Sequence, residues 1–294
     1  MTDMLDRVSL PTGVDLDVQV AGSRDRPAVI LLHGFPESHR TWRDIVPDLA
    51  QDHFVLAPDQ RGYARSSKPE GVEQYAPERI VADLLALADH YGIERFTLVG
   101  HDWGGAVAWM AALQHPGRVE RLVIINAPHP LVFQRSLFDS AEQCAASQYI
   151  RRFRDTTIDS GLTGAGLERF FSSTFAKVLT RAVAGEDKAA YLDEWGQPGA
   201  MTAMLNWYRA SAIVVPAMDE TPPRPAYLDG PFPPVTQRTL VVWGTGDTAL
   251  LPVQLEGLGD YVPDLTVVRV EGAGHFVPWE EPRAVVTAMR EWGI

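Results

Sequence analysis

The stretch around Asp102 holds a carboxylate where a nucleophile is expected. A predicted strand over 96–99 leads into Gly100-His101-Asp102-Trp103-Gly104, and a predicted helix follows over 106–113. In a sharp strand-to-helix turn, the residues two before and two after the central one come close together, so glycine is needed at both. This pattern is typical of a nucleophile elbow in which Asp replaces the usual serine. The alternative is that Asp102 only caps the following helix.

Two more side chains with suitable chemistry follow predicted strands. Asp247 comes just after the strand over 239–243, and His275 just after the strand over 265–270. Because the carboxyl ends of parallel strands meet at one edge of a sheet, we expect both to lie near Asp102. Taken singly, His275 would be a structural or solvated histidine and Asp247 a turn residue. A nucleophile, an acid and a histidine in this chain order together favour catalysis. The other histidines lack such a placement and are predicted to be structural: His33, His39, His53, His90, His101, His115 and His129.

Two backbone amides are candidates for an oxyanion hole. His33-Gly34-Phe35-Pro36 follows the predicted strand over 28–32. Glycine lets the backbone approach a ligand closely, and proline stiffens the turn, so the Phe35 amide can donate to a developing oxyanion. The amide of Trp103, directly after Asp102, is the second predicted donor. Taken alone, the first stretch would be an ordinary Gly-Pro loop.

An aspartate nucleophile restricts the reaction. Attack on an ester or amide carbonyl would form a high-energy anhydride, whereas attack on a saturated carbon forms an alkyl ester. The expected substrate is therefore a strained epoxide or a carbon that bears a halide. His275, oriented by Asp247, would then deprotonate the water that cleaves the ester.

The amino-acid composition indicates what general class of protein this is. The 294 residues are 46% hydrophobic and 22% charged, as in an ordinary globular protein. The formal net charge of −12 disfavours nucleic acid and anionic membranes as partners, and leaves a homo-oligomer open. Cys144 is the only cysteine, which excludes an intrachain disulfide and a cysteine-based zinc cluster. Asp3 and Asp6 argue against a signal peptide, and no apolar run is long enough to span a membrane. We expect a cytoplasmic protein.

Short apolar runs alternate with helical patterns in two parts of the chain. Buried strands are predicted over 28–32, 54–57, 96–99, 122–125, 239–243 and 265–270. Helices are predicted over 77–91, where Gly92 is the stop, between the last two strands, and after Pro282. This alternation is typical of an α/β fold with a mostly parallel, doubly wound sheet.

The middle of the chain has a different pattern. Residues 128–234 show helical stretches without convincing strands, and seven prolines between Pro216 and Pro234 predict irregular structure there. We therefore expect an α/β core of residues 1–127 and 235–294, with residues 128–234 inserted as a helical lid.

Four stretches carry a family resemblance: HGFPES at 33–38, PDQRGYARSS at 58–67, GHDWGG at 100–105 and GHF at 274–276. With them the sequence resembles the α/β-hydrolase superfamily, in its epoxide hydrolase branch, which is related to the haloalkane dehalogenases. One departure is Ala64, where the family usually has a second glycine. The resemblance implies the α/β-hydrolase fold and an aspartate nucleophile, with no metal and no organic cofactor.

The same resemblance implies two lid tyrosines that donate hydrogen bonds to the epoxide oxygen. Tyr208, within LNWYR at 205–209, matches the second tyrosine motif, although a core aromatic is the alternative. Tyr149, within QYIRRF at 148–153, resembles the first, with Tyr191 as its competitor. The residues expected to contact the substrate are Trp103, Phe35, Pro36 and Trp207.

The expected activity converts a small apolar epoxide and water into a vicinal diol through an ester on Asp102. A haloalkane dehalogenase is the first alternative, because a halide needs only weak donors such as the indole of Trp103, with Trp195 and Trp207 also available. Asn126 stands where some dehalogenases place their acid, but an amide cannot serve. The second alternative is a non-catalytic protein that binds a small ligand on the same scaffold.

Overall fold

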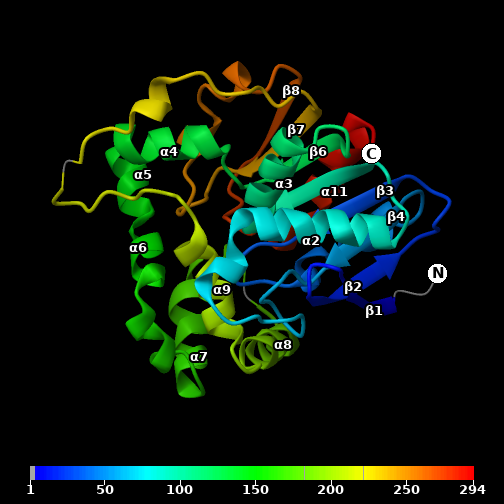
Figure 1. Ribbon diagram of the computed structural model, residues 1–294, viewed down its shortest axis with the longest axis horizontal. Coiled ribbons are helices and arrows are strands. Elements are labelled where there is room, and N and C mark those ends of the chain that lie inside the picture. Colours follow the sequence, from blue (N-terminus) through cyan, green and yellow to red (C-terminus); the bar gives the residue numbers. More distant parts are fainter. Residues whose placement is uncertain (1–3, 182, 221) are drawn as a thin grey trace.

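The computed structural model describes residues 4–181, 183–220 and 222–294, which form one eight-stranded sheet with helices around it (Figure 1). The strand order is β1-β2-β4-β3-β5-β6-β7-β8. The pairs β1·β2 and β2·β4 are antiparallel, and all other pairs are parallel. The strands are β1 Met4–Ser9, β2 Asp15–Ala21, β3 Ala28–Leu32, β4 Phe54–Pro58, β5 Phe96–His101, β6 Val119–Ile125, β7 Arg238–Gly244 and β8 Leu265–Val270. The predicted mostly parallel α/β fold is confirmed. The sheet also contains two strands that were not predicted, β1 and β2.

The central strands are covered on both faces, as their continuous apolar runs predict. Along β3, Ile30 belongs to one buried apolar cluster, whereas its neighbours Val29 and Leu31 belong to the other. This alternation follows from the two-residue period of a strand. The helices are α1 Val46–Leu49, α2 Pro77–His90, α3 Trp103–Gln114, α4 Pro130–Asp139, α5 Ala141–Ala146, α6 Gln148–Arg154, α7 Ala165–Phe170, α8 Gly185–Trp195, α9 Ala200–Ala210, α10 Val277–Glu280 and α11 Pro282–Trp292.

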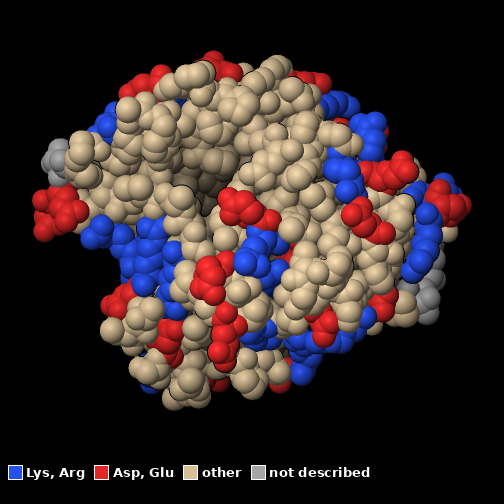
Figure 2. Space-filling model, in the orientation of Figure 1, with Lys and Arg blue, Asp and Glu red and all other residues tan. Residues whose placement is uncertain are grey.

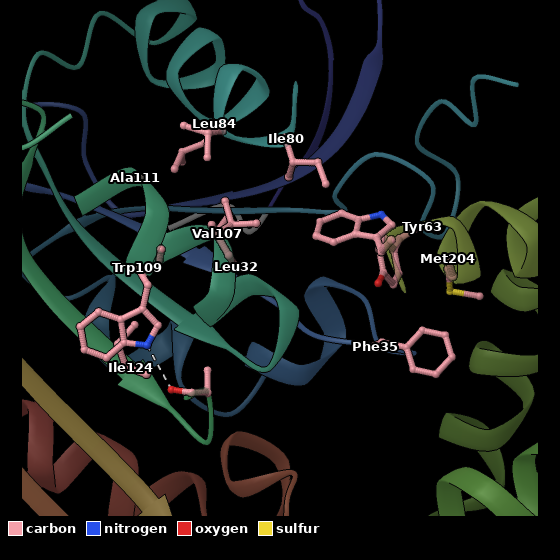
Figure 3. Packing of buried hydrophobic residues seen from close by; sticks show 14 of the residues in the cluster. Leu32, Phe35, Tyr63, Ile80, Leu84, Val107, Trp109, Ala111, Ile124 and Met204 are labelled. Atoms are coloured by element: carbon pink, nitrogen blue, oxygen red, sulfur yellow. Dashed lines mark hydrogen bonds between the residues drawn. The ribbon is translucent and has the colours of Figure 1, made fainter. Parts of the chain in front are cut away.

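Helices α2 and α3 fix the central strand β5 from one side. Figure 3 shows Ile80 and Leu84 of α2 near Val107 and Ala111 of α3, all of them buried. The indole N–H of Trp109 donates to the carbonyl of Ala127 at 3.1 Å, which ties α3 to the chain after β6. The start of α3 is therefore held firmly at the carboxyl edge of the sheet.

Most predicted helices agree with the structure, and one does not. Helix α2 begins at Pro77, and Gly92 follows it with φ +71°, as predicted. The prediction of a helix between β7 and β8 is wrong, because that stretch forms only the 3-10 turns Pro252–Leu255 and Leu258–Asp260. Gly257, with φ +69°, lies between the two turns and prevents a continuous helix. None of the described helices is long and apolar enough to cross a membrane.

Residues 128–234, which we call the helical segment, contain α4–α9 and no strand among the residues that the structure describes. In Figure 1, α5, α6 and α7 lie to the left of the sheet. Within the proline-rich tract, the 3-10 turn Ala226–Asp229 is the only regular element among the described residues. The division of the chain into a core and a lid stays a prediction.

Candidate active site

Asp102 lies in the sharp turn between β5 and α3 with φ +49°, a conformation that is rare for a residue with a side chain. A Cβ on Gly104 would lie 2.1 Å from the carbonyl oxygen of Leu32, and one on Gly100 would lie 2.4 Å from that of Gly104. Only glycine fits at either place. Asp102 stands at the N-cap position of α3, but its side chain makes no capping hydrogen bond, so the carboxylate is free for another role.

The carboxylate of Asp102 has two polar neighbours. The backbone amide of Phe35 donates to Oδ1 at 2.8 Å. The ring nitrogen Nε2 of His275 lies 3.4 Å from Oδ2. One oxygen is thus held by the turn after β3, and the other faces the histidine. The role of the Trp103 amide as a second donor stays a prediction.

His275 and Asp247 form a close buried pair. Nδ1–H of His275 donates to Oδ2 of Asp247 at 2.7 Å, and both side chains are buried. The other oxygen of Asp247 accepts the amides of Ala249 and Leu250 at 2.8 and 2.9 Å. The structure therefore brings together the three residues that the sequence placed at strand ends.

Asn126 also holds Asp247. It follows β6 with φ +39°, and its Nδ2 donates to Oδ2 of Asp247 at 2.7 Å. Its Oδ1 accepts the amide of Gly244 at 2.8 Å, which ties the side chain to the end of β7. Sequence reasoning treated Asn126 only as an amide unable to act as the acid, and missed this positioning contact.

The charges in this cluster shift the pKa values in opposite directions. Burial lowers the pKa of His275, but the carboxylates of Asp247 and Asp102 outweigh burial and raise the pKa well above its usual value. Burial raises the pKa of Asp102, but the hydrogen bond and charge of His275, with His101 and the Phe35 amide, lower it overall. Asp102 is therefore ionised at neutral pH, as a nucleophile requires.

Tyr149 and Tyr208 line the same cavity as Asp102. Their ring centroids lie 6.1 Å apart at an angle of 82°. Burial, and then the charge of Asp102, raise the pKa of both hydroxyls well above the usual value, so both stay protonated. Tyr191 is buried elsewhere, against Phe175 at 5.2 Å, and does not line this cavity. The structure thus brings Tyr149, rather than Tyr191, to Asp102.

The cavity has a volume of about 350 Å³, a size that suits a small organic ligand. Figure 2 shows a hollow on this face between α2 and the chain after α9, with mostly uncharged residues around it. The lining residues are Pro77, Glu78, Asp102, Trp103, Ala106, Met110, Pro128, Pro130, Leu131, Phe133, Gln134, Tyr149, Ile150, Tyr208, Ser211, Ala212, Ile213, Tyr227, Phe232 and Leu250. Among the described residues, no group of three or more His, Cys, Asp or Glu side chains is arranged to hold a metal ion.

Of the four residues expected to contact the substrate, only Trp103 lines the cavity. The indole of Trp207 is buried behind Trp103, at 5.9 Å between ring centroids, and donates to the carbonyl of Arg61 at 3.0 Å. The ring of Phe35 packs on Tyr208 at 5.2 Å, and the carbonyl of Pro36 accepts the indole N–H of Trp195 at 2.7 Å. Contacts of Phe35, Pro36 and Trp207 with a substrate therefore stay predictions, and the rings of Phe35 and Trp207 pack against Tyr208 and Trp103, which line the cavity.

Glu280 is a supporting residue that sequence reasoning missed. Its buried carboxylate accepts the amides on both sides of His275, from Gly274 at 2.7 Å and from Phe276 at 3.2 Å. It also accepts the hydroxyl of Thr180, from the helical segment. The sequence offers no signal for this role, because Glu281 stands beside Glu280 and only one of the two turns inward.

A second buried contact links the elbow to the histidine loop. Nε2–H of His101 donates to the backbone carbonyl of His275 at 2.9 Å. Nδ1 of His101 lies 3.1 Å from Oε2 of Glu37, and both side chains are fully buried. The sequence predicts a structural role for His101 and includes Glu37 only in the HGFPES stretch, so it did not predict this contact between them.

Known proteins are similar to this chain in fold and in sequence. Residues 27–282 match the family model described as alpha/beta hydrolase fold. A solved structure of novel epoxide hydrolases from metagenomes of hot environments is 46% identical, with a TM-score of 0.90 and 99% of each chain covered. The AB hydrolase superfamily protein YfhM of Bacillus subtilis is 34% identical, over 95% of this chain and 94% of the relative. Epoxide hydrolase A of Mycobacterium tuberculosis is 31% identical, over 95% of this chain and 94% of the relative. The chain therefore belongs to the α/β-hydrolase fold family, as a hydrolase of its epoxide hydrolase branch.

Proposed function

We propose that this protein converts an epoxide and water into a vicinal diol, with Asp102 as the nucleophile. The observation that carries the proposal is one cavity lined by the Asp102 carboxylate and by two tyrosine rings, with the His275–Asp247 pair beside the carboxylate. Both tyrosines come from the helical segment, which supports its assignment as a lid over the sheet.

The first half-reaction opens the ring. Oδ2 of Asp102 attacks an epoxide carbon, because Oδ1 already accepts the Phe35 amide. The carbon–oxygen bond of the ring breaks as the ester bond forms. The departing alkoxide is strongly basic, and takes a proton from Tyr149 or Tyr208, whose raised pKa keeps the hydroxyls protonated until then. The tyrosinate then takes a proton from His275, which leaves the imidazole neutral for the next step.

The second half-reaction hydrolyses the ester. Once Asp102 is esterified it has no charge, so one of the two carboxylates that raise the pKa of His275 is lost. His275 can then accept a proton from water, and the hydroxide adds to the ester carbon. The negative charge develops on Oδ1, which the Phe35 amide stabilises. When the bond to the diol oxygen breaks, that oxygen takes the proton from His275. The carboxylic acid left on Asp102 then gives its proton to His275, which restores the carboxylate and the protonated imidazole.

The indole donors argue against a halide as leaving group. A dehalogenase would need free indole N–H groups beside Asp102. The N–H groups of Trp195 and Trp207 donate to backbone carbonyls, and Trp103 makes a hydrogen bond with Tyr208. Tyr149 and Tyr208, whose hydroxyls stay protonated, line the cavity instead and suit an alkoxide as the leaving group.

Two measurements test the proposal. Diol formation from a styrene-oxide-type substrate is compared with halide release from bromoalkanes, and the double substitution Tyr149→Phe and Tyr208→Phe should abolish the first. With enzyme in excess in ¹⁸O-water, the first diol should carry ¹⁶O from Asp102. Halide release without epoxide turnover would favour the dehalogenase, ¹⁸O in the first diol would exclude the covalent route, and no turnover of either substrate would favour a binding protein.

A further inference from the structure

Beyond Asp102, the lining of the cavity includes residues of α3, of α4 and of the chain after α9. Its walls run past Met110 of α3 and Leu131 of α4 to Phe232 in the proline-rich tract. The mouth is marked by Tyr227, which is 58% exposed, and by the exposed Glu78 at the start of α2. This open side gives a substituent of the epoxide a long path toward solvent.

Aromatic rings that do not line the cavity pack against the tyrosine pair. Phe153 packs against Tyr208 at 5.1 Å and against Tyr149 at 5.5 Å, and Phe35 packs against both Phe153 and Phe170 at 5.3 and 6.1 Å. We call Phe35, Phe153 and Phe170 the aromatic wall. The exposed fractions of its members are only 6, 6 and 7%, and none of the three lines the cavity. Close-packed buried rings leave no room for an added methyl group.

The aromatic wall is backed by further rings. Phe170 contacts Trp195 at 5.6 Å between ring centroids, and Trp195 contacts Phe175 at 5.7 Å. Phe175 in turn contacts Phe276, the residue after His275, at 4.9 Å. The wall therefore cannot yield by moving one side chain, because each ring rests on another.

The residues on the open side of the cavity would not stabilise a charged substituent. Both ends of the Gln134 side-chain amide bond to the backbone of Val214 at 2.8 Å, and the hydroxyl of Ser211 donates to the carbonyl of Tyr208 at 2.9 Å. Among the described residues, Glu78 and Asp102 are the only charged ones that line the cavity, both are acidic, and none of those lining it is a lysine or arginine. A neutral, apolar substituent fits this path, whereas an anionic one would meet like charge.

We infer, on the basis of the proposed function, that the substrates are terminal epoxides with a single neutral apolar substituent. With the ring oxygen at Tyr149 and Tyr208, the two ring carbons lie one toward the open side and one toward the aromatic wall. The carbon toward the open side can bear a long chain. The carbon toward the wall has space for hydrogen only, so an internal epoxide would press an alkyl group against the rings of Tyr149 and Tyr208, which Phe153 supports from outside the cavity.

Positional isomers of one alkyl epoxide test this inference. 1,2-Epoxyoctane and the cis and trans forms of 2,3-epoxyoctane have the same formula. The 2,3-isomers bear a methyl group on the second ring carbon and a chain one carbon shorter on the first. The expected kcat/KM for the 2,3-isomers is lower by roughly 10- to 200-fold, the usual effect of one misplaced methyl or methylene group. Equal values for the 1,2- and 2,3-isomers would overturn the inference while leaving the proposed function intact. No diol from any isomer would overturn the proposed function and the inference with it.

Substitutions of buried phenylalanines show whether the aromatic wall, and not the intrinsic reactivity of the isomers, causes the difference in kcat/KM. Phe153→Ala, and the milder Phe153→Leu, should raise the kcat/KM of the 2,3-isomers relative to that of the 1,2-isomer. Phe171→Ala is the matched control, because Phe171 packs on Phe175 and Trp195 and is buried to a similar extent, at 4% exposure. It should leave the ratio unchanged. The inference fails if both Phe153 variants keep the ratio of the unmodified protein, or if Phe171→Ala changes it equally.

Discussion

The substitution Glu280→Gln separates the two halves of the proposed reaction. The carboxylate of Glu280 accepts the amides on both sides of His275, so it sets where the imidazole stands relative to Asp102. A glutamine has the same shape, but one of its two acceptors becomes an NH₂ group. That group would face an N–H or O–H donor, so one hydrogen bond is lost.

The size of the effect follows from these contacts. A hydrogen bond to a charged, buried group contributes about 1.5–3 kcal/mol, and we expect the free energy of unfolding to fall by that amount. A displacement of about 1 Å in a reacting group costs on the order of 100-fold in rate. We therefore expect hydrolysis of the ester, which needs His275, to slow by roughly that factor. Formation of the ester uses Asp102, Tyr149 and Tyr208, and should slow much less.

Quenched single-turnover reactions measure both steps. The intact mass of the protein reports the alkyl ester on Asp102, and diol release reports its hydrolysis. In Glu280→Gln the alkylated protein should accumulate. Glu281→Gln is the control, because it makes the same chemical change on the exposed neighbour. An unchanged rate of ester hydrolysis in Glu280→Gln, or an equal loss in both half-reactions, would refute the reasoning.

Three further predictions concern stability. The pKa of His275 is raised in the folded protein, so its stabilising contribution is complete below its unfolded pKa of about 6.5 and is lost as pH rises through the folded value. The difference in unfolding free energy between the unmodified protein and His275→Gln should therefore shrink with rising pH in urea titrations, and a constant difference would contradict this. Asn126→Gly keeps the positive φ but removes the donor to Asp247, and should lower the urea midpoint by the equivalent of about 1.5–3 kcal/mol. An unchanged midpoint would show that the contact is unimportant. Gly104→Ala should destabilise by about 3 kcal/mol or more, whereas Gly117→Ala, which has open space, should stay within about 0.5 kcal/mol, as thermal melts would show.

The sequence predicted the central strands that are buried on both faces and missed the two at the antiparallel edge. It also predicted β8 as a buried strand, but β8 is the other edge of the sheet and none of its residues is fully buried. A continuous apolar run such as 28–32 is a strong signal, because parallel strands are covered by helices on both sides. β1 and β2 instead mix polar and apolar residues, and Met4 and Leu5 are more than half exposed. The polar Asp17 is accommodated in β2 by an ion pair with Arg7 of β1 at 2.5 Å, a contact that exists only after the strands have paired.

The candidate site also has one part that the sequence could predict and one part that it could not. Asp102, Asp247 and His275 could be named because each comes just after a strand, and the topology of a parallel sheet then brings strand ends together. The walls of the cavity depend on how the helical segment packs, and no local pattern describes that. For this reason the sequence could identify Tyr149 by motif, but could not tell that Trp207 lies behind the cavity wall.

The two ends of the helical segment join the sheet at adjacent strands, and this affects how substrate preference can change in evolution. β6 and β7 are direct neighbours, with Ile125 paired to Val242, so the chain leaves the sheet and returns to it at adjacent places. Closing a longer loop between two fixed points is cheap in entropy, at about 0.6 kcal/mol for each doubling of its length. The sheet and the Asp102 elbow therefore tolerate insertions, deletions or exchange between β6 and β7 with little change in their own free energy of folding. New cavities can arise there while Asp102 and His275 stay where they are.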